Sequence, residues 1–207
     1  MAISQLETDF FLALDVDFVT NKGAHEQLRN LYTTWPNLTD MLKNKTLVVW
    51  PAFGPVATQT AAPDNKNQVQ SWYKQGLIEP FQRQQFPAKH GPTQYELWFQ
   101  NSSQVGPSYP ISYQTQFEPF VLAYRHGLPR YSSGFAGHTY NRSSWTAETH
   151  RLGYRFQALR DFFVFSTGTT PAAAGRDAPV LKAREWQNFL AYKERIYNGN
   201  RTIQNTP

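Results

Sequence analysis

The chain contains no cysteine among its 207 residues. Disulfide bonds, zinc–thiolate sites and cysteine nucleophiles are therefore excluded. No apolar run approaches the roughly 18 residues of a membrane-spanning helix, and the mean hydropathy is -0.58. The first ten residues contain Glu7 and Asp9 but no basic cluster, so we expect no targeting segment in this chain.

Clusters of basic residues are also missing, although the net charge is +5 and the sequence pI is about 9.4. The lysines and arginines are scattered, without zinc-finger spacing or an RNA-binding aromatic signature. We therefore expect no nucleic-acid partner. A basic surface is equally consistent with an anionic substrate such as a sugar nucleotide.

Aromatic side chains are abundant, with 6 Trp, 11 Tyr and 15 Phe, and 40% of all residues are hydrophobic. This composition supplies enough apolar surface for a core, and the length suits one domain. Strand and helix patterns alternate between irregular loops, which favours an α/β or mixed fold. Apolar spacing and turn residues predict helices over 24–32, 67–75, 145–152 and 180–197, and strands over 46–53, 117–122, 154–159 and 162–165.

The segment Thr8–Val19 is an apolar run interrupted by Asp15 and Asp17. Its residue types and length predict one buried strand. Unpaired carboxylates are costly inside a strand, so we place the pair at its end, facing a cleft. Residues i and i+2 of a strand point to the same side, so both carboxylates can converge on a hard divalent cation. A plain solvated strand end explains the pattern as well.

The sequence contains five N-x-Ser/Thr sequons, which begin at Asn37, Asn44, Asn101, Asn141 and Asn200. Sequons accept N-linked glycans in proteins that enter the secretory pathway. Their number favours a secretory lumen, although the sequons can also be accidental.

Four stretches of the chain carry a family resemblance when they are taken in order. They are Phe10–Phe18, Leu47–Phe53, Phe117–Val121 and Phe135–Asn141. Together they resemble glycosyltransferase family 49, the family of the LARGE-type and β-1,4-glucuronyltransferases. Shorter agreement occurs at Gly91–Tyr95 with Trp98, at Leu128–Tyr131 and at Gly153–Phe156. The likeness runs from about Met1 to the final helix.

The resemblance implies a GT-A-like α/β fold, in which a mixed sheet with flanking helices forms one domain over residues 1–200. Residues 201–207 would be a disordered tail. Asp15 and Asp17 would hold Mn²⁺ against the diphosphate of a UDP-sugar. The reaction would be metal-dependent inverting transfer of a sugar, such as glucuronic acid, to a glycan acceptor. The resemblance also implies the Golgi or another secretory lumen.

The resemblance also suggests further site residues, each with a simpler reading. Glu118 could be the catalytic base or could pair with a nearby arginine under the sheet. His90 and His138 could contact substrate, or be ordinary loop histidines. Trp98 could stack on a sugar or belong to the core. Asn141 matches a family position but also begins a sequon.

The chain departs from the family pattern in three places. The family has a further segment before the D-x-D pair, and the uncapped helix predicted at Met1–Leu6 suggests that this segment is missing. Ser166 falls where a metal-binding histidine is expected, and Thr169 where a second histidine often lies. Ser132 and Ser133 replace an acidic pair. The alternatives are a non-catalytic remnant that binds a glycan or a partner, or a start upstream of Met1.

Overall fold

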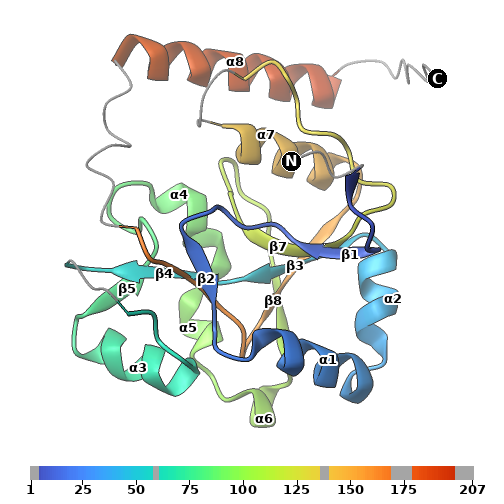
Figure 1. The fold of residues 1–207 in the computed structure, drawn as a ribbon. Coiled ribbons are helices and arrows are strands. Elements are labelled where there is room, and N and C mark those ends of the chain that lie inside the picture. The colour runs from blue at the N-terminus through green and yellow to red at the C-terminus, as the bar shows by residue number, and fades with distance from the viewer. Residues whose placement is uncertain (1–4, 58–60, 136–139, 169–178, 199–207) are drawn as a thin grey trace.

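Two mixed β-sheets form the centre of the molecule, and helices pack around them (Figure 1). The computed structural model describes residues 5–57, 61–135, 140–168 and 179–198. The first sheet has the strand order β1 (Phe10–Leu12), β7 (Phe120–Tyr124), β3 (Thr46–Trp50), β8 (Arg155–Leu159) and β6 (Ser108–Ile111). The second has the order β2 (Phe18–Thr20), β9 (Val164–Ser166), β4 (Ala52–Pro55) and β5 (Ile78–Pro80).

Among the described strands, one pair in each sheet is parallel, β3 with β8 and β4 with β9, and the other pairs are antiparallel. Three stretches of chain pass from the first sheet to the second: β1 to β2, β3 to β4, and β8 to β9. Pro51 lies at one of these crossings, where its missing N–H cannot interrupt a ladder. The two sheets are therefore joined at several points and cannot separate easily.

Both faces of the first sheet are buried. The sequence of its strand β3 is therefore apolar throughout and does not alternate between apolar and polar residues. Leu47 and Val49 face one apolar cluster, whereas Val48 and Trp50 face the other, as expected for alternating side chains. Helix α2 (Asn37–Lys43) contributes to the Val48 cluster. Helices α3 (Lys66–Lys74), α5 (Tyr95–Trp98) and α7 (Asn141–Arg151) contribute to the Leu47 cluster. Each fully buried aliphatic side chain stabilises the fold by about 1.5–3 kcal/mol.

The remaining helices lie around these layers. The long helix α8 packs against α7, where the Tyr192 hydroxyl donates to Glu148 and the Tyr197 hydroxyl lies 3.0 Å from His150 Nδ1. Within the described residues, no helix is long and apolar enough to cross a membrane. The bounds are α1 (Ala24–Thr34), α4 (Pro87–His90), the 3₁₀ turn η2 (Gly91–Thr93), α6 (Ser102–Val105) and α8 (Pro179–Asn198).

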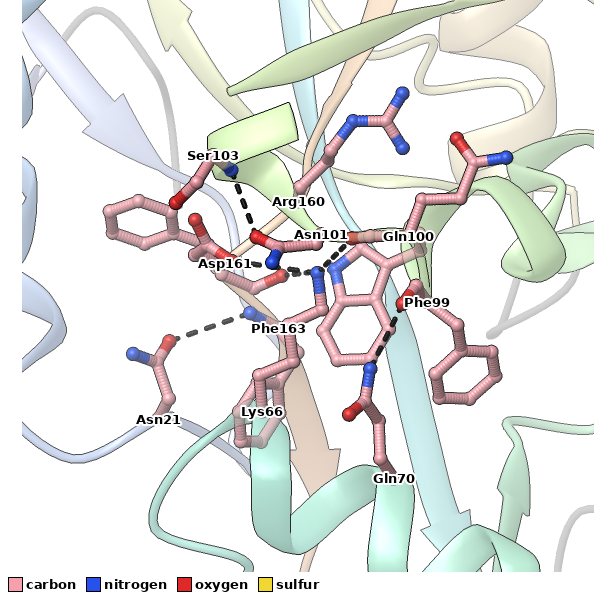
Figure 2. Close-up of polar contacts among 12 residues, drawn as sticks. Asn21, Lys66, Gln70, Phe99, Gln100, Asn101, Ser103, Arg160, Asp161 and Phe163 are labelled. Atoms are coloured by element: carbon pink, nitrogen blue, oxygen red, sulfur yellow. Dashed lines mark hydrogen bonds and ion pairs between the residues drawn. The ribbon is translucent and has the colours of Figure 1, made fainter. Parts of the chain in front are cut away.

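Lys66, in the first turn of α3, ties this helix to two other segments (Figure 2). Its ammonium donates to the Gln100 carbonyl at 2.8 Å and lies 3.5 Å from Asp161 Oδ1. It also lies 5.0 Å from the centre of the Trp98 ring. Burial lowers the pKa of Lys66, and Asp161 opposes that effect. The lysine thus anchors α3 beside the loop between β8 and β9.

The mixed α/β class predicted from the sequence is confirmed, but it is built from two mixed sheets rather than one. The helices predicted over 24–32, 67–75, 145–152 and 180–197 are present. The strand predicted over 46–53 is wrong as a single strand, because the chain changes sheet at Pro51 and forms β3 and β4. The prediction of one strand over Thr8–Val19 is wrong, because this segment contains the two short strands β1 and β2 in different sheets. The strand predicted over 117–122 begins only at Phe120, so Glu118 precedes it. Residues 1–4 of the predicted first helix and the predicted tail lie outside the described residues.

Candidate functional site

Asp15 and Asp17 lie in the turn that carries the chain from the first sheet to the second. The Phe18 N–H donates to the Asp15 carbonyl at 3.1 Å, which closes the turn. Val16, between the two acids, is fully exposed, and both acids are exposed as well. A change of sheet at this point therefore presents two carboxylates to solvent. The D-x-D pair does follow the end of a strand, as predicted, but it sits in a turn rather than along a ladder.

The backbone after β9 supports the Asp17 side of this turn. Thr167 donates to the Asp17 carbonyl through its N–H at 2.8 Å and its hydroxyl at 3.1 Å. A methyl group at Gly168 would lie 3.2 Å from Asp17 Oδ2, which is a tight contact. The absence of a side chain at this position therefore leaves room for the Asp17 carboxylate. Ser166 is paired in register with Phe18, the residue after Asp17. Position 166, where the resemblance expects a histidine ligand, thus lies beside the pair but carries a buried hydroxyl.

Asp15 forms an ion pair with Arg142, which comes from the first turn of α7 and is 127 positions away in sequence. The side chain of Arg142 is 20% exposed and that of Asp15 is 50% exposed. The guanidinium carbon lies 4.5 Å from the centre of the Phe120 ring. Arg142 also hydrogen-bonds the Tyr131 hydroxyl, whose pKa is raised by burial and partly lowered again by Arg142. One arginine therefore joins the D-x-D turn to α7 and β7.

Glu118 lies close by but is already engaged by the protein. Lys89 Nζ is 2.9 Å from Glu118 Oε2, and the Ser143 hydroxyl donates to Oε1. The Glu118 N–H donates to the Lys89 carbonyl at 2.8 Å. Glu118 is 8% exposed. Its partner is thus a lysine rather than the arginine considered from the sequence, and a role as base would require an acceptor to reach this pair.

His90 is buried at the end of α4, beside the same group of residues. Its ring stacks on Phe120 at 5.9 Å between centres and meets the edge of Phe81 at 5.4 Å. Burial, together with the nearby positive charges of Arg142 and Lys89, lowers the pKa of His90 to about 3. The imidazole is therefore neutral at physiological pH. It lines a cavity of about 190 Å³ with Pro80, Phe81, Arg83, Pro87, Gly91, Tyr95 and Glu96.

The other proposed substrate residues lie in different surroundings. Trp98 is fully buried, with its indole N–H donating to the Phe162 carbonyl at 3.0 Å. A sugar could stack on this ring only if its core neighbours moved. Asn141 is the first residue of α7, directly before Arg142. His138 lies outside the described residues.

The pair Asp15 and Asp17 fits a divalent cation that is shared with a ligand. Small hard cations are often bound by one or two carboxylates together with substrate phosphates and water. Within the described ranges, no group of three or more His, Asp or Glu side chains could hold a metal ion. Within these residues, Asp15 and Asp17 therefore do not form a closed metal site by themselves.

Comparison with known proteins identifies the family of the chain. A family model described as a glycosyl-transferase for dystroglycan matches residues 1–198. The chain belongs to this family.

Relatives with names of this kind are identical to the chain at about a quarter of the aligned positions. Beta-1,4-glucuronyltransferase 1 of Mus musculus is 27% identical over 199 residues, which is 93% of this chain and 45% of the relative. The Homo sapiens protein of the same name is 27% identical and matches 90% of this chain and 43% of its own length. Xylosyl- and glucuronyltransferase LARGE2s of Gallus gallus is 25% identical and matches 83% of this chain and 22% of its own length. The chain thus spans less than half the length of these relatives.

Sequence reasoning missed the residues that surround the acids. The site residues proposed from the sequence do not include Arg142, Lys89, Ser143 or Gly168. Arg142 and Ser143 directly follow Asn141, the last residue of a stretch that carried the resemblance. Their place next to that stretch is the sequence feature from which Arg142 and Ser143 could have been proposed. Lys89 is brought to Glu118 only by tertiary contact.

Proposed function

We propose that this chain acts in metal-dependent, inverting transfer of a sugar from a UDP-sugar to a glycan acceptor. The observation that carries the proposal is the exposed Asp15–Asp17 turn at the junction of the two sheets, in a chain of this glycosyltransferase family. Glucuronic acid is the first donor sugar to test, because relatives named glucuronyltransferases match most of the chain.

Asp15 and Asp17 would hold the divalent cation, for which we propose Mn²⁺. When bound, such a cation neutralises the charge that develops on the leaving diphosphate. His90, neutral and beside the cavity of about 190 Å³, would contribute an uncharged hydrogen-bonding group to a sugar. Glu118 stays the proposed base, and it would act only where the acceptor hydroxyl competes with Lys89 and Ser143 for its oxygens.

Calorimetry with UDP tests the donor site. We expect UDP to bind the full chain with Mn²⁺ present and much more weakly without it. The variants Asp15→Asn and Asp17→Asn should lose the metal-dependent heat. Asp9→Asn is the matched control, because Asp9 precedes the same turn but pairs with Arg125 and His126. Absence of metal-dependent heat in the unmodified chain would reject the proposal.

A secretory lumen is the proposed location, as expected for the Golgi. Among the sequons that the structure describes, Asn37, Asn44 and Asn101 are exposed, whereas Asn141 is partly buried. Expression through a secretory pathway, followed by removal of N-linked glycans, should shift the electrophoretic mobility. Asn→Gln variants at the three exposed positions should each reduce that shift, and an unchanged mobility would contradict this location.

A non-catalytic module that binds a glycan or a partner is the second candidate. It is favoured by buried Ser166 at the position of an expected metal ligand and by the closed Glu118–Lys89 pair. This alternative predicts glycan binding that is unaffected by Mn²⁺ and by Asp15→Asn. A glycan array probed with and without Mn²⁺ distinguishes the two candidates.

A further inference from the structure

The Arg142–Asp15 ion pair places a protein cation on a carboxylate that the proposed function assigns to a metal. We propose that Arg142 is a donor-positioning residue. Its guanidinium pairs with Asp15 before the ligands bind, leaves when a divalent cation takes that carboxylate, and then binds the diphosphate of the nucleotide sugar. This inference rests on the proposed function and adds a residue and a sequence of contacts to it.

A metal ion and Arg142 compete for Asp15. The guanidinium now contacts Asp15 Oδ1 and is mostly shielded from water. A divalent cation on the same carboxylate would bring like charges together, and their repulsion is strongest where solvent screening is weak. Metal binding therefore favours a position of Arg142 away from Asp15. Arg142 in turn weakens the binding of a metal that arrives without nucleotide.

Once a metal takes Asp15 and Asp17, the described carboxylate left in these surroundings is Glu118, whose charge acts on Tyr131 together with that of Asp15. Glu118 already accepts from Lys89 and Ser143. Tyr131, which Arg142 also contacts, is a neutral phenol because burial raises its pKa. Lys89 and Arg142 both lower the pKa of His90 through their positive charges. The surroundings of Arg142 therefore already contain a second positive charge. An incoming anion is therefore the remaining partner for the guanidinium.

The diphosphate is that anion, because the cation and the phosphates occupy the D-x-D site together. The planar guanidinium presents parallel N–H donors that match two phosphate oxygens. The Phe120 ring supports it from one side at 4.5 Å, so a short rotation of the outer side chain leaves that contact in place. Arg142 thus couples the two ligands: it opposes the metal alone and favours the metal with its diphosphate.

The test compares Mn²⁺ binding and UDP binding in the full chain, by electron paramagnetic resonance for free Mn²⁺ and by calorimetry for UDP. In Arg142→Gln we expect Mn²⁺ alone to bind about tenfold more tightly, and UDP in saturating Mn²⁺ to bind about tenfold more weakly. Arg142→Lys should keep the competition with Mn²⁺ and recover part of the UDP affinity. Lysine keeps the positive charge but lacks the parallel N–H donors of the planar guanidinium. Arg151→Gln, in the last turn of α7, should change neither.

Opposite shifts for the two ligands are the result that a merely structural role cannot produce. Loss of both affinities in Arg142→Gln and Arg142→Lys, or a gain in both, would overturn the inference while leaving the proposed function intact. If the unmodified chain bound neither Mn²⁺ nor UDP, the proposed function would fail and this inference with it. A thermal melt of each variant accompanies the titrations, and Arg142→Lys alone decides if Arg142→Gln fails to fold.

Discussion

At the scale of single residues, the candidate site is a set of charges held in pairs. Asp15 is paired with Arg142, and Glu118 with Lys89, while Asp17 faces the space that Gly168 leaves. An exposed pair contributes little to stability, whereas a buried one is costly to break. The two pairs therefore predict different consequences when one partner is removed.

Replacing Glu118 by Gln should lower the free energy of unfolding by about 2–3 kcal/mol, less than for a fully buried pair because the Lys89 side chain is 21% exposed. The change leaves the Lys89 ammonium without its carboxylate. The double variant Glu118→Gln with Lys89→Met should recover more than half of that loss. Urea denaturation measures both, with exposed Glu96→Gln as the control. A fully stable Glu118→Gln that cannot transfer sugar would instead favour Glu118 as the base.

Stability should fall as the pH is lowered below about 6.5, because of His90. Its pKa in the folded chain is about 3 and its ordinary value is 6.5. Between these values the unfolded chain binds a proton that the folded chain does not, so stability is present above 6.5 and is lost as the pH falls toward 3. From pH 6.5 to pH 5 the loss from this one group is about 2 kcal/mol.

Urea denaturation at several pH values checks this expectation. His90→Gln should remove this contribution to the slope, because glutamine does not titrate. His25→Gln, an exposed histidine on α1, should keep the slope of the unmodified chain. Equal slopes in the unmodified chain and in His90→Gln would contradict the prediction.

At the scale of secondary-structure elements, short helices depend on side-chain contacts for their position. Helix α3 has nine residues, too few to be stable alone in water. It is capped by the Asn65 side chain, which accepts from the Gln68 N–H at 3.0 Å. It is then anchored at Lys66 (Figure 2). These contacts make a helix that the sequence predicts into a fixed part of the fold.

Lys66→Met should lower the free energy of unfolding by about 1–2 kcal/mol, because the charged hydrogen bond to Gln100 and the contact of the ammonium with the Trp98 ring are both lost. The Asp161 contact adds little, since that carboxylate is half exposed. Lys74→Met, in the last turn of the same helix, is the control because Lys74 is exposed. Hydrogen exchange in α3 should increase for the first variant only. Equal effects of both variants would show that Lys66 is not an anchor.

At the scale of the whole molecule, the chain passes from the first sheet to the second three times, at β1–β2, β3–β4 and β8–β9, and returns at β2–β3 and β5–β6. We therefore expect one cooperative unfolding transition, in which tryptophan fluorescence and far-UV circular dichroism report the same urea midpoint. Phe53→Leu, at a fully buried position of β4, should lower both midpoints together. Val105→Ala, an exposed position on α6, should change neither. Separate transitions for the two probes would show that the sheets unfold independently.

The same whole-molecule arrangement brings distant parts of the chain to the candidate site. Asp17 meets the segment after β9 through hydrogen bonds that span 150 positions, and Asp15 meets α7. The site is therefore expected to be lost whenever the two sheets separate, even though it lies at the surface.

What the sequence determined by itself is the local order of the chain. The apolar run in β3 predicts a strand because both its faces are buried, and Gly153 ends α7 because its positive φ of 86° suits glycine. The D-x-D pair and the ordered motifs predict the family, since these signals lie in contiguous residues. Tertiary structure alone decided the rest: the division of Thr8–Val19 between two sheets, the burial of Trp98, and the partners of Asp15 and Glu118. The physical reason is that a charged or aromatic side chain is stabilised by the residues that pack against it in the folded chain. These partners are distant in sequence, so a local sequence pattern does not predict them.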